Sequence, residues 1–147
     1  MKVALGADHG GFELKGLLIA HLKHLGHDVL DLGTSSNEAV DYPRFARAVG
    51  QEVAAGRCDR GIVIDGAGIG SAMVANKIPG VRAALAYDLS SARNGREHNN
   101  ANVLTLGAGL IGPLLAEQIV TVWLETKCTE ERHLRRVAMI EEQGATP

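Results

Sequence analysis

The segment Gly66-Ala67-Gly68-Ile69-Gly70 carries glycines at alternate positions and directly follows the apolar run Gly61-Ile-Val-Ile-Asp65. Glycines in this pattern between a strand and a helix let backbone N–H groups converge on one point, and the start of the next helix adds partial positive charge. Such a loop suits a phosphate group, or an oxyanion that develops during a reaction. It equally fits a tight strand-to-helix turn without a ligand, and it lacks the GxGxxG and GxxxxGK[ST] nucleotide patterns.

Asp65 ends the apolar run, where its carboxylate borders a dry core. A carboxylate in that place can act as a general base near neutral pH. The alternative is that Asp65 caps the following helix or hydrogen-bonds to the glycine loop. The residues alone leave both interpretations open.

Other polar residues with possible chemistry are spread along the chain. Asp8-His9 follows the first apolar run, and this pair can hold substrate hydroxyls or phosphate, or simply cap a helix. His98 and Asn99 lie in a polar segment that offers many hydrogen-bonding groups and no packing benefit. Arg132 and Arg136 are four residues apart, so on a helix they share a face and either clamp a phosphate dianion or remain solvated.

The elements that must position these residues alternate between strands and helices. We expect strands at 2–6, 28–32, 61–65, 81–86 and 102–106, helices at 11–25, 43–55, 71–77, 89–96, 113–124 and 129–142, and a frayed end at 143–147. This alternation predicts a single doubly wound α/β domain over 1–147, with a mostly parallel five-stranded, Rossmann-like sheet and helices on both faces. Because ligands bind beyond the carboxyl ends of the strands in such folds, we expect the polar groups to collect at that one edge.

Composition excludes several classes of protein. The 147 residues are 46% hydrophobic and 22% charged, which rules out disordered and collagen-like chains, and no apolar run approaches the ~20 residues of a membrane span. A net charge of −2 and only 3% aromatic residues disfavour nucleic-acid binding. His21, His24 and His27 have a spacing that resembles that of metal ligands, but no carboxylate or cysteine lies at ligand spacing from them. We therefore expect no metal there. Cys58 and Cys128 are expected to be free thiols in a reducing cytoplasm.

Several longer stretches together resemble the ribose-5-phosphate isomerase B family, which includes the subunits of galactose-6-phosphate isomerase. The stretches are 6–15, 41–43, 66–70, 75–83, 96–103 and 132–136. The resemblance implies an aldose–ketose isomerase of phosphorylated sugars, by default ribose 5-phosphate, that works through a cis-enediolate without metal or cofactor. It also implies homodimers or dimers of dimers whose sites are built by two subunits.

The resemblance further implies roles for individual residues. His98 would open the sugar ring with the help of Asp8, and Asn99 would contact sugar hydroxyls. Backbone amides around 66–70 would hold the enediolate oxygens. The phosphate would contact His9, Arg132 and Arg136, and the rest of the pocket would be lined by Asp41, Tyr42, Gly66, Ala67, Gly68, Ile69, Gly70 and Ser71.

The chain departs from the family pattern at the catalytic base. Many members have a cysteine where this chain has Asp65, another branch has a glutamate where it has Ser71, and Ala67 replaces a common threonine or serine. Asp65 therefore inherits the base role by position, since a carboxylate can carry a proton between C1 and C2. The change leaves the substrate open, with a tetrose phosphate or galactose 6-phosphate as alternatives. A non-catalytic sugar-phosphate-binding subunit is the alternative function.

Overall fold

Five strands and six α-helices alternate along the chain in the computed structural model, which describes residues 1–142. The strands are β1 (Lys2–Ala7), β2 (Asp28–Asp31), β3 (Arg60–Asp65), β4 (Ala83–Leu85) and β5 (Val103–Gly107). The helices are α1 (Phe12–His24), α2 (Tyr42–Ala54), α3 (Ile69–Ala75), α4 (Leu89–Glu97), α5 (Pro113–Glu125) and α6 (Glu131–Glu141), and a 3-10 turn, η1 (His9–Gly11), follows β1. The predicted fray at 143–147 lies outside the described residues. Among the described helices, none combines the length and the apolar character needed to cross a membrane.

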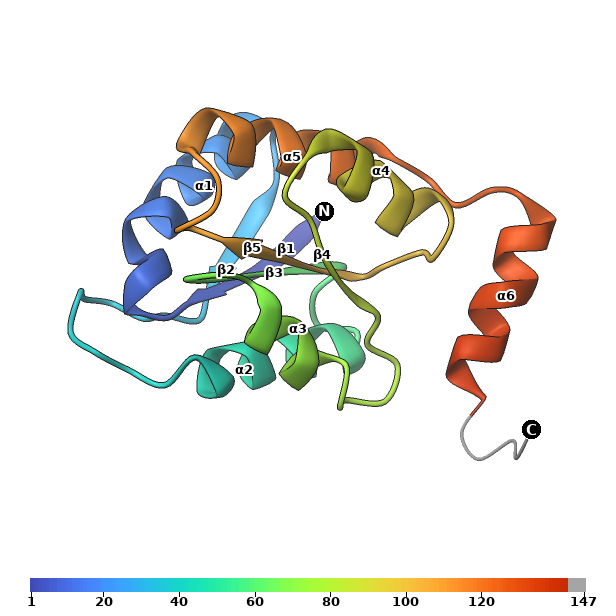
Figure 1. Cartoon of the computed structure of the whole chain (residues 1–147), viewed down its shortest axis with the longest axis horizontal. Coiled ribbons are helices and arrows are strands. Elements are labelled where there is room, and N and C mark those ends of the chain that lie inside the picture. The colour runs from blue at the N-terminus through green and yellow to red at the C-terminus, as the bar shows by residue number, and fades with distance from the viewer. Residues whose placement is uncertain (143–147) are drawn as a thin grey trace.

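The strands form one sheet in the order β2-β1-β3-β5-β4, and every neighbouring pair is parallel. Helices α1, α4 and α5 cover one face of this sheet, and α2 and α3 cover the other (Figure 1). The predicted doubly wound α/β fold is therefore confirmed. The chain changes its direction of travel across the sheet between β1 and β3, and in such folds ligands bind beyond the carboxyl ends of the strands at this switch point.

Alternating residues of the central strands pack against the two helical layers. In β3, Ile62 and Ile64 belong to the core shared with α1 and α5, whereas Val63 belongs to the core shared with α2 and α3. All three side chains are buried, as is typical of a parallel sheet covered on both faces. Gly61 lets α2 approach closely, because a Cβ at this position would lie 2.5 Å from a Val49 methyl carbon.

Two elements differ from the sequence prediction, and a third lies apart from the rest of the fold. α3 begins at Ile69 rather than at residue 71, because Gly68 takes a left-handed φ of 76° and turns the chain directly into the helix. β4 spans only three residues instead of 81–86, and it is an edge strand that pairs with β5 alone. α6 stands away from the two helical layers, on the opposite side of the molecule from the loop between β2 and α2 (Figure 1).

Candidate active site

The first turn after β1 is organised around the Asp8 carboxylate. Asp8 is buried, and its Oδ1 accepts hydrogen bonds from the amides of Gly10 at 2.9 Å and Gly11 at 3.2 Å. This turn lies tightly against β3, since a Cβ on Gly11 would come within 2.5 Å of the Ile64 carbonyl oxygen. Asp8 is therefore the N-cap of η1, which is one of the two interpretations that its sequence position allows.

The glycine loop is organised in the same way around Asp65, whose carboxylate is buried at the end of β3. Oδ1 accepts hydrogen bonds from the amides of Gly68 and, at 3.0 Å, Ala67. Oδ2 accepts from the Ser71 hydroxyl and, at 3.2 Å, from the Ser71 amide. The convergent donors of the loop thus hold a carboxylate of the chain itself, as the loop-binding interpretation of Asp65 requires.

This arrangement narrows the predicted set of substrate contacts. The amides of Ala67 and Gly68 are occupied by Asp65, and the Ser71 side chain is fully buried, which corrects its expected contact with substrate. In the part of the chain that the structure describes, the amides of Gly66, Ile69 and Gly70 have no hydrogen-bond partner. These three amides remain as donors for a substrate oxygen.

The Asp8 turn, the glycine loop and the start of α2 meet at one place on the carboxyl edge. A Cβ on Gly10 would lie 3.6 Å from the Gly66 amide nitrogen, so the two turns are in contact. A Cβ on Gly70 would lie 2.5 Å from the Tyr42 ring, so only a glycine allows this ring to lie on the loop. The structure therefore brings these predicted residues together.

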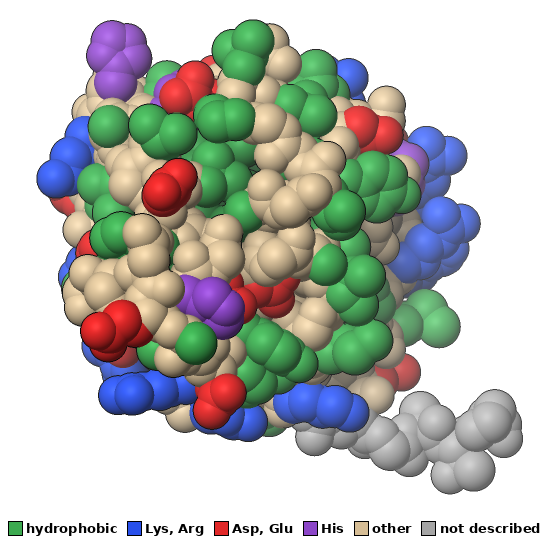
Figure 2. Space-filling view, turned by 60° about the vertical axis from the view of Figure 1, so that its left-hand side comes forward, with side chains coloured by type: hydrophobic (Ala, Val, Ile, Leu, Met, Phe, Trp, Pro, Cys, Tyr) green, Lys and Arg blue, Asp and Glu red, His purple; other side chains and the backbone are tan. Residues whose placement is uncertain are grey.

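His9 joins the same group through the loop before α2. Its Nδ1 accepts a hydrogen bond from the Val40 amide at 3.2 Å, and the exposed Asp41 follows directly as the N-cap residue of α2. Figure 2 turns this side of the molecule towards the viewer and shows a histidine beside acidic side chains at its centre. We call this group the carboxyl-edge cluster; it consists of Asp8, His9, Asp41, Tyr42 and residues 65–71.

His98 and Asn99 lie at the opposite edge of the sheet, so the prediction that all polar groups collect at one edge is wrong. They follow the last turn of α4 and precede β5, and the segment that leads into a parallel strand lies at the amino end of that strand. The Asn102 carbonyl accepts the Gly61 amide at 3.0 Å, which places this segment beside the start of β3. Asp65 is at the other end of β3, roughly 13 Å further along at ~3.3 Å per residue.

α6 brings its basic residues to the same amino edge. The His133 ring stacks on the His98 ring, with centroids 4.2 Å apart and an angle of 10° between the planes. Arg132 and Arg136 flank His133 on α6 and are exposed. We call His98, Asn99, Arg132, His133 and Arg136 the amino-edge cluster.

His133 is the member of this cluster that the sequence reasoning missed. It is only 4% exposed, and its Nε2 has no hydrogen-bond partner within the described residues. Burial lowers the pKa of His133, and the nearby His98, Arg132 and Arg136 lower it further. The one available signal was its place between two arginines that share a helix face.

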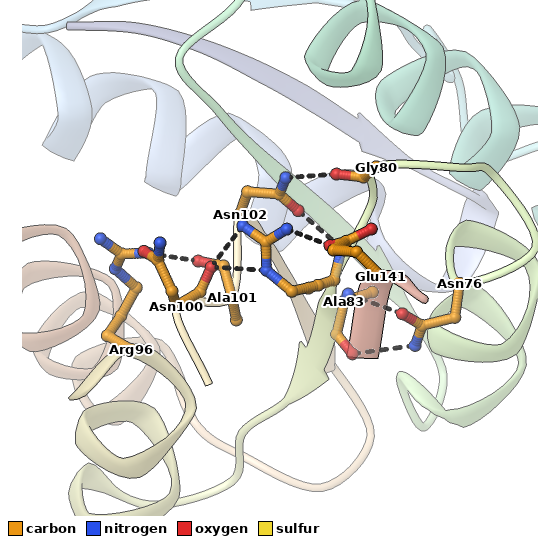
Figure 3. A network of polar contacts seen from close by, with 9 residues as sticks. Asn76, Gly80, Ala83, Arg96, Asn100, Ala101, Asn102 and Glu141 are labelled. Atoms are coloured by element: carbon orange, nitrogen blue, oxygen red, sulfur yellow. Dashed lines mark hydrogen bonds and ion pairs between the residues drawn. The ribbon is translucent and has the colours of Figure 1, made fainter. Parts of the chain in front are cut away.

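A network of polar contacts braces the segment between α4 and β5, next to the amino-edge cluster (Figure 3). The buried Arg96 donates from Nη1 to Asn100 Oδ1 at 2.8 Å and to the Ala101 carbonyl at 2.7 Å. Arg82 donates to the Asn100 carbonyl from Nε at 3.1 Å and from Nη2 at 3.0 Å, and pairs with Glu141 of α6. Burial lowers the pKa of Arg96 to about 10, and the positive charges of the nearby Arg60 and Arg82 lower it further.

His21, Cys58 and Cys128 lie outside the two clusters. Over residues 1–142, no three His, Cys, Asp or Glu side chains are grouped so that they could hold a metal ion. His21 Nε2 lies 2.8 Å from Thr121 Oγ1, a hydrogen bond that joins α1 to α5. Cys58 is buried, Cys128 is partly buried, and both are free thiols.

Comparison with known proteins identifies the family. The ribose/galactose isomerase family model matches residues 3–140. The chain is 44% identical to ribose-5-phosphate isomerase B of Escherichia coli over 139 residues, which cover 95% of this chain and 93% of that protein. It superimposes on ribose-5-phosphate isomerase B of Clostridium thermocellum with a TM-score of 0.94, 48% identity and coverage of 96% and 95%. The Mycoplasma genitalium enzyme with bound ribulose-5-phosphate gives a TM-score of 0.92, 37% identity and coverage of 95% and 93%. The resemblance noted in the sequence is confirmed, and the chain belongs to the ribose/galactose isomerase family.

Proposed function

We propose that the chain is an aldose–ketose isomerase of phosphorylated sugars that interconverts ribose 5-phosphate and ribulose 5-phosphate. The observation that carries the proposal is the Asp65 carboxylate, which lies beside unpartnered backbone amides in the carboxyl-edge cluster. An enediolate reaction needs a proton acceptor and oxyanion donors side by side. The similarity to proteins named ribose-5-phosphate isomerase B over nearly the whole chain supports the choice of substrate.

In this scheme Asp65 transfers the proton between the two carbons. Its carboxylate takes the proton from C2 of the aldose, the C2–H electron pair forms the C1–C2 double bond, and the carbonyl electrons move to O1. The free amides of Gly66, Ile69 and Gly70 stabilise the resulting enediolate oxygens. A proton then passes from O2 to O1, and Asp65 returns its proton to C1, which completes the ketose. These steps use no metal ion and no cofactor.

The amino-edge cluster supplies the groups for the rest of the substrate. His98, helped by Asp8, opens the sugar ring, and Asn99 contacts the sugar hydroxyls. Arg132 and Arg136 bind the phosphate together with His9. Two exposed guanidinium groups, beside a buried imidazole whose Nε2 has no hydrogen-bond partner among residues 1–142, suit a phosphate dianion.

This assignment requires two subunits, because the two clusters lie at opposite edges of one chain. A homodimer or a dimer of dimers brings the amino-edge cluster of one copy to the carboxyl-edge cluster of another. The outer face of α3, next to the glycine loop, is suited to such a contact, since Ile69 is 50% and Met73 is 64% exposed. A shallow hollow of about 440 Å³ lies there, lined by Ile69, Ala72, Met73, Asn76, Lys77 and Leu85. The proposed location of the enzyme is the cytoplasm.

The proposal is tested with a panel of phosphorylated aldoses and ketoses, assayed in both directions in deuterated water. We expect ribose 5-phosphate and ribulose 5-phosphate to interconvert, with solvent deuterium entering the product and with activity that persists in EDTA. Faster turnover of a tetrose phosphate or of galactose 6-phosphate would reassign the substrate. Binding of sugar phosphates without any conversion or exchange would instead identify a non-catalytic subunit.

A further inference from the structure

Within the described residues, Ser71 is the only residue that donates hydrogen bonds to the second oxygen, Oδ2, of the Asp65 carboxylate. The Ser71 hydroxyl and amide both donate to Oδ2, whereas Oδ1 is held by the amides of Ala67 and Gly68. The Ser71 side chain has 0% exposure, so it cannot reach a substrate. Its hydroxyl therefore acts on the carboxylate alone.

The two oxygens of Asp65 are held by different kinds of donor. Both donors to Oδ1 are backbone amides of the loop, and they remain whatever side chains the loop carries. At Oδ2 the backbone contributes only the Ser71 amide at 3.2 Å, and the remaining bond comes from a side chain. Loss of this hydroxyl would leave Oδ2 held only by the Ser71 amide, and so less firmly than Oδ1.

We propose that Ser71 is a positioning residue for proton transfer, whose hydroxyl fixes the plane of the Asp65 carboxylate relative to C1 and C2 of the sugar. This assignment rests on the proposed function, in which Asp65 takes the C2 proton and returns it to C1. Proton transfer between carbon and oxygen is sensitive to small displacements of the acceptor. A hydroxyl that orients the acceptor therefore affects the chemical step and leaves substrate binding unchanged.

The chain offers a matched control in a second pair of the same residue types. Asp88 and Ser91 form the capping box of α4, in which the Ser91 amide donates to Asp88 Oδ1 at 2.6 Å and the Ser91 hydroxyl to the Asp88 carbonyl at 3.0 Å. Ser91 lies outside both clusters. Ser91→Ala thus removes a hydrogen-bonded hydroxyl from a helix N-terminus without touching Asp65.

The experiment measures kcat, KM, thermal unfolding and the isotope effect of C2-deuterated ribose 5-phosphate for the full chain, Ser71→Ala, Ser71→Cys and Ser91→Ala. For Ser71→Ala we expect kcat to fall about tenfold, the size of one hydrogen bond to a charged group, with KM within about twofold. The isotope effect on kcat should rise, because the proton-transfer step becomes more rate-limiting. Ser71→Cys, which keeps a weak S–H donor of similar shape, should recover part of kcat, and Ser91→Ala should keep wild-type kinetics.

The outcomes separate this assignment from the function on which it rests. A wild-type chain that isomerises no sugar phosphate overturns both. An active wild type whose Ser71→Ala variant keeps its kcat, or loses kcat with no rise in the isotope effect, overturns the positioning role alone. If Ser71→Ala does not fold, Ser71→Cys decides by the same two readouts, since a lower kcat with a raised isotope effect supports the role and unchanged values refute it.

Discussion

The carboxyl-edge and amino-edge clusters hold their functional groups by different means. At the carboxyl edge, the Asp8 and Asp65 carboxylates are both buried, and every donor to them comes from within six residues along the chain. Each carboxylate takes its donors from the turn that it organises. The two carboxylates are therefore placed by local sequence and by the sheet beneath them, whereas His9 and Tyr42 join the cluster through contacts with more distant parts of the chain.

The amino-edge cluster depends instead on contacts between distant parts of the chain. The Arg96 side chain joins the segment before β5 to the Thr126 carbonyl, at 3.2 Å, directly after α5. The His98 side chain remains 43% exposed, and the one buried imidazole, His133, lacks a partner at Nε2 in the described residues. The two buried carboxylates of the carboxyl-edge cluster thus have hydrogen-bond partners within the described residues, whereas the buried His133 of the amino-edge cluster has none at Nε2.

The largest effect on activity is expected when the negative charge at the centre of the carboxyl-edge cluster is removed. Asp65→Asn keeps the shape but no longer accepts a proton, so we expect kcat to fall by at least ~10²–10⁴-fold with KM largely kept. The measurement is steady-state kinetics beside Asp88→Asn, which alters a capping carboxylate at the start of α4. Normal turnover by Asp65→Asn would reduce Asp65 to a loop anchor and leave the base elsewhere.

A second test asks whether the two clusters work together across subunits. Asp65→Asn and His98→Asn each damage one cluster, and both variants are expected to be inactive. When they are mixed and allowed to exchange, half of a randomly paired population is mixed dimers with one intact site each, so about a quarter of the wild-type activity should return. Demonstrated subunit exchange without recovery would show that each chain contains its whole site.

The sequence predicted the carboxyl-edge cluster because that cluster obeys local and general rules. Glycines after an apolar run predicted the loop, and the carboxyl-edge rule for open α/β sheets predicted that Asp8 and Asp65 would meet. The same rule failed for His98, which precedes its neighbouring strand rather than following it. Sequence also gives no sign of the direction in which a side chain points, so the inward turn of Ser71 was visible only in the structure.

The amino-edge cluster could be predicted only as separate pieces. The spacing of Arg132 and Arg136 indicates a shared helix face, but nothing local indicates that His133 of α6 stacks on His98 at the end of α4. Contacts between residues about 35 positions apart depend on the path of the whole chain. The family resemblance implied roles for these residues, but only the fold shows where they lie relative to one another.

A smaller effect is expected from weakening the brace of the amino-edge cluster. Arg96→Met leaves the oxygens of Asn100, Ala101 and Thr126 without their donor in a buried site, which should lower the free energy of unfolding by about 2–4 kcal/mol. Chemical denaturation measures the loss, with Arg93→Met, an exposed arginine of the same helix, as the control. An equal loss in both variants would mean that Arg96 does not brace the cluster.

The smallest expected effect concerns the pH dependence of stability at the amino edge. The pKa of His133 lies below its usual value of 6.5 because the ring is buried, and because His98, Arg132 and Arg136 oppose a further positive charge. The unfolded chain therefore takes up a proton at this residue before the folded chain does, and the folded state loses stability as pH falls below about 6.5. His133→Asn removes this titration, so its Tm should fall less than that of the wild type between pH 7.5 and pH 5. Tm measured for both proteins across this range checks the sign, with His24→Asn as a control at an exposed histidine of α1. If acidification lowers Tm by the same amount in the wild type and in His133→Asn, protonation of His133 does not destabilise the folded state. Another group of the amino-edge cluster then compensates the positive charge on the buried ring.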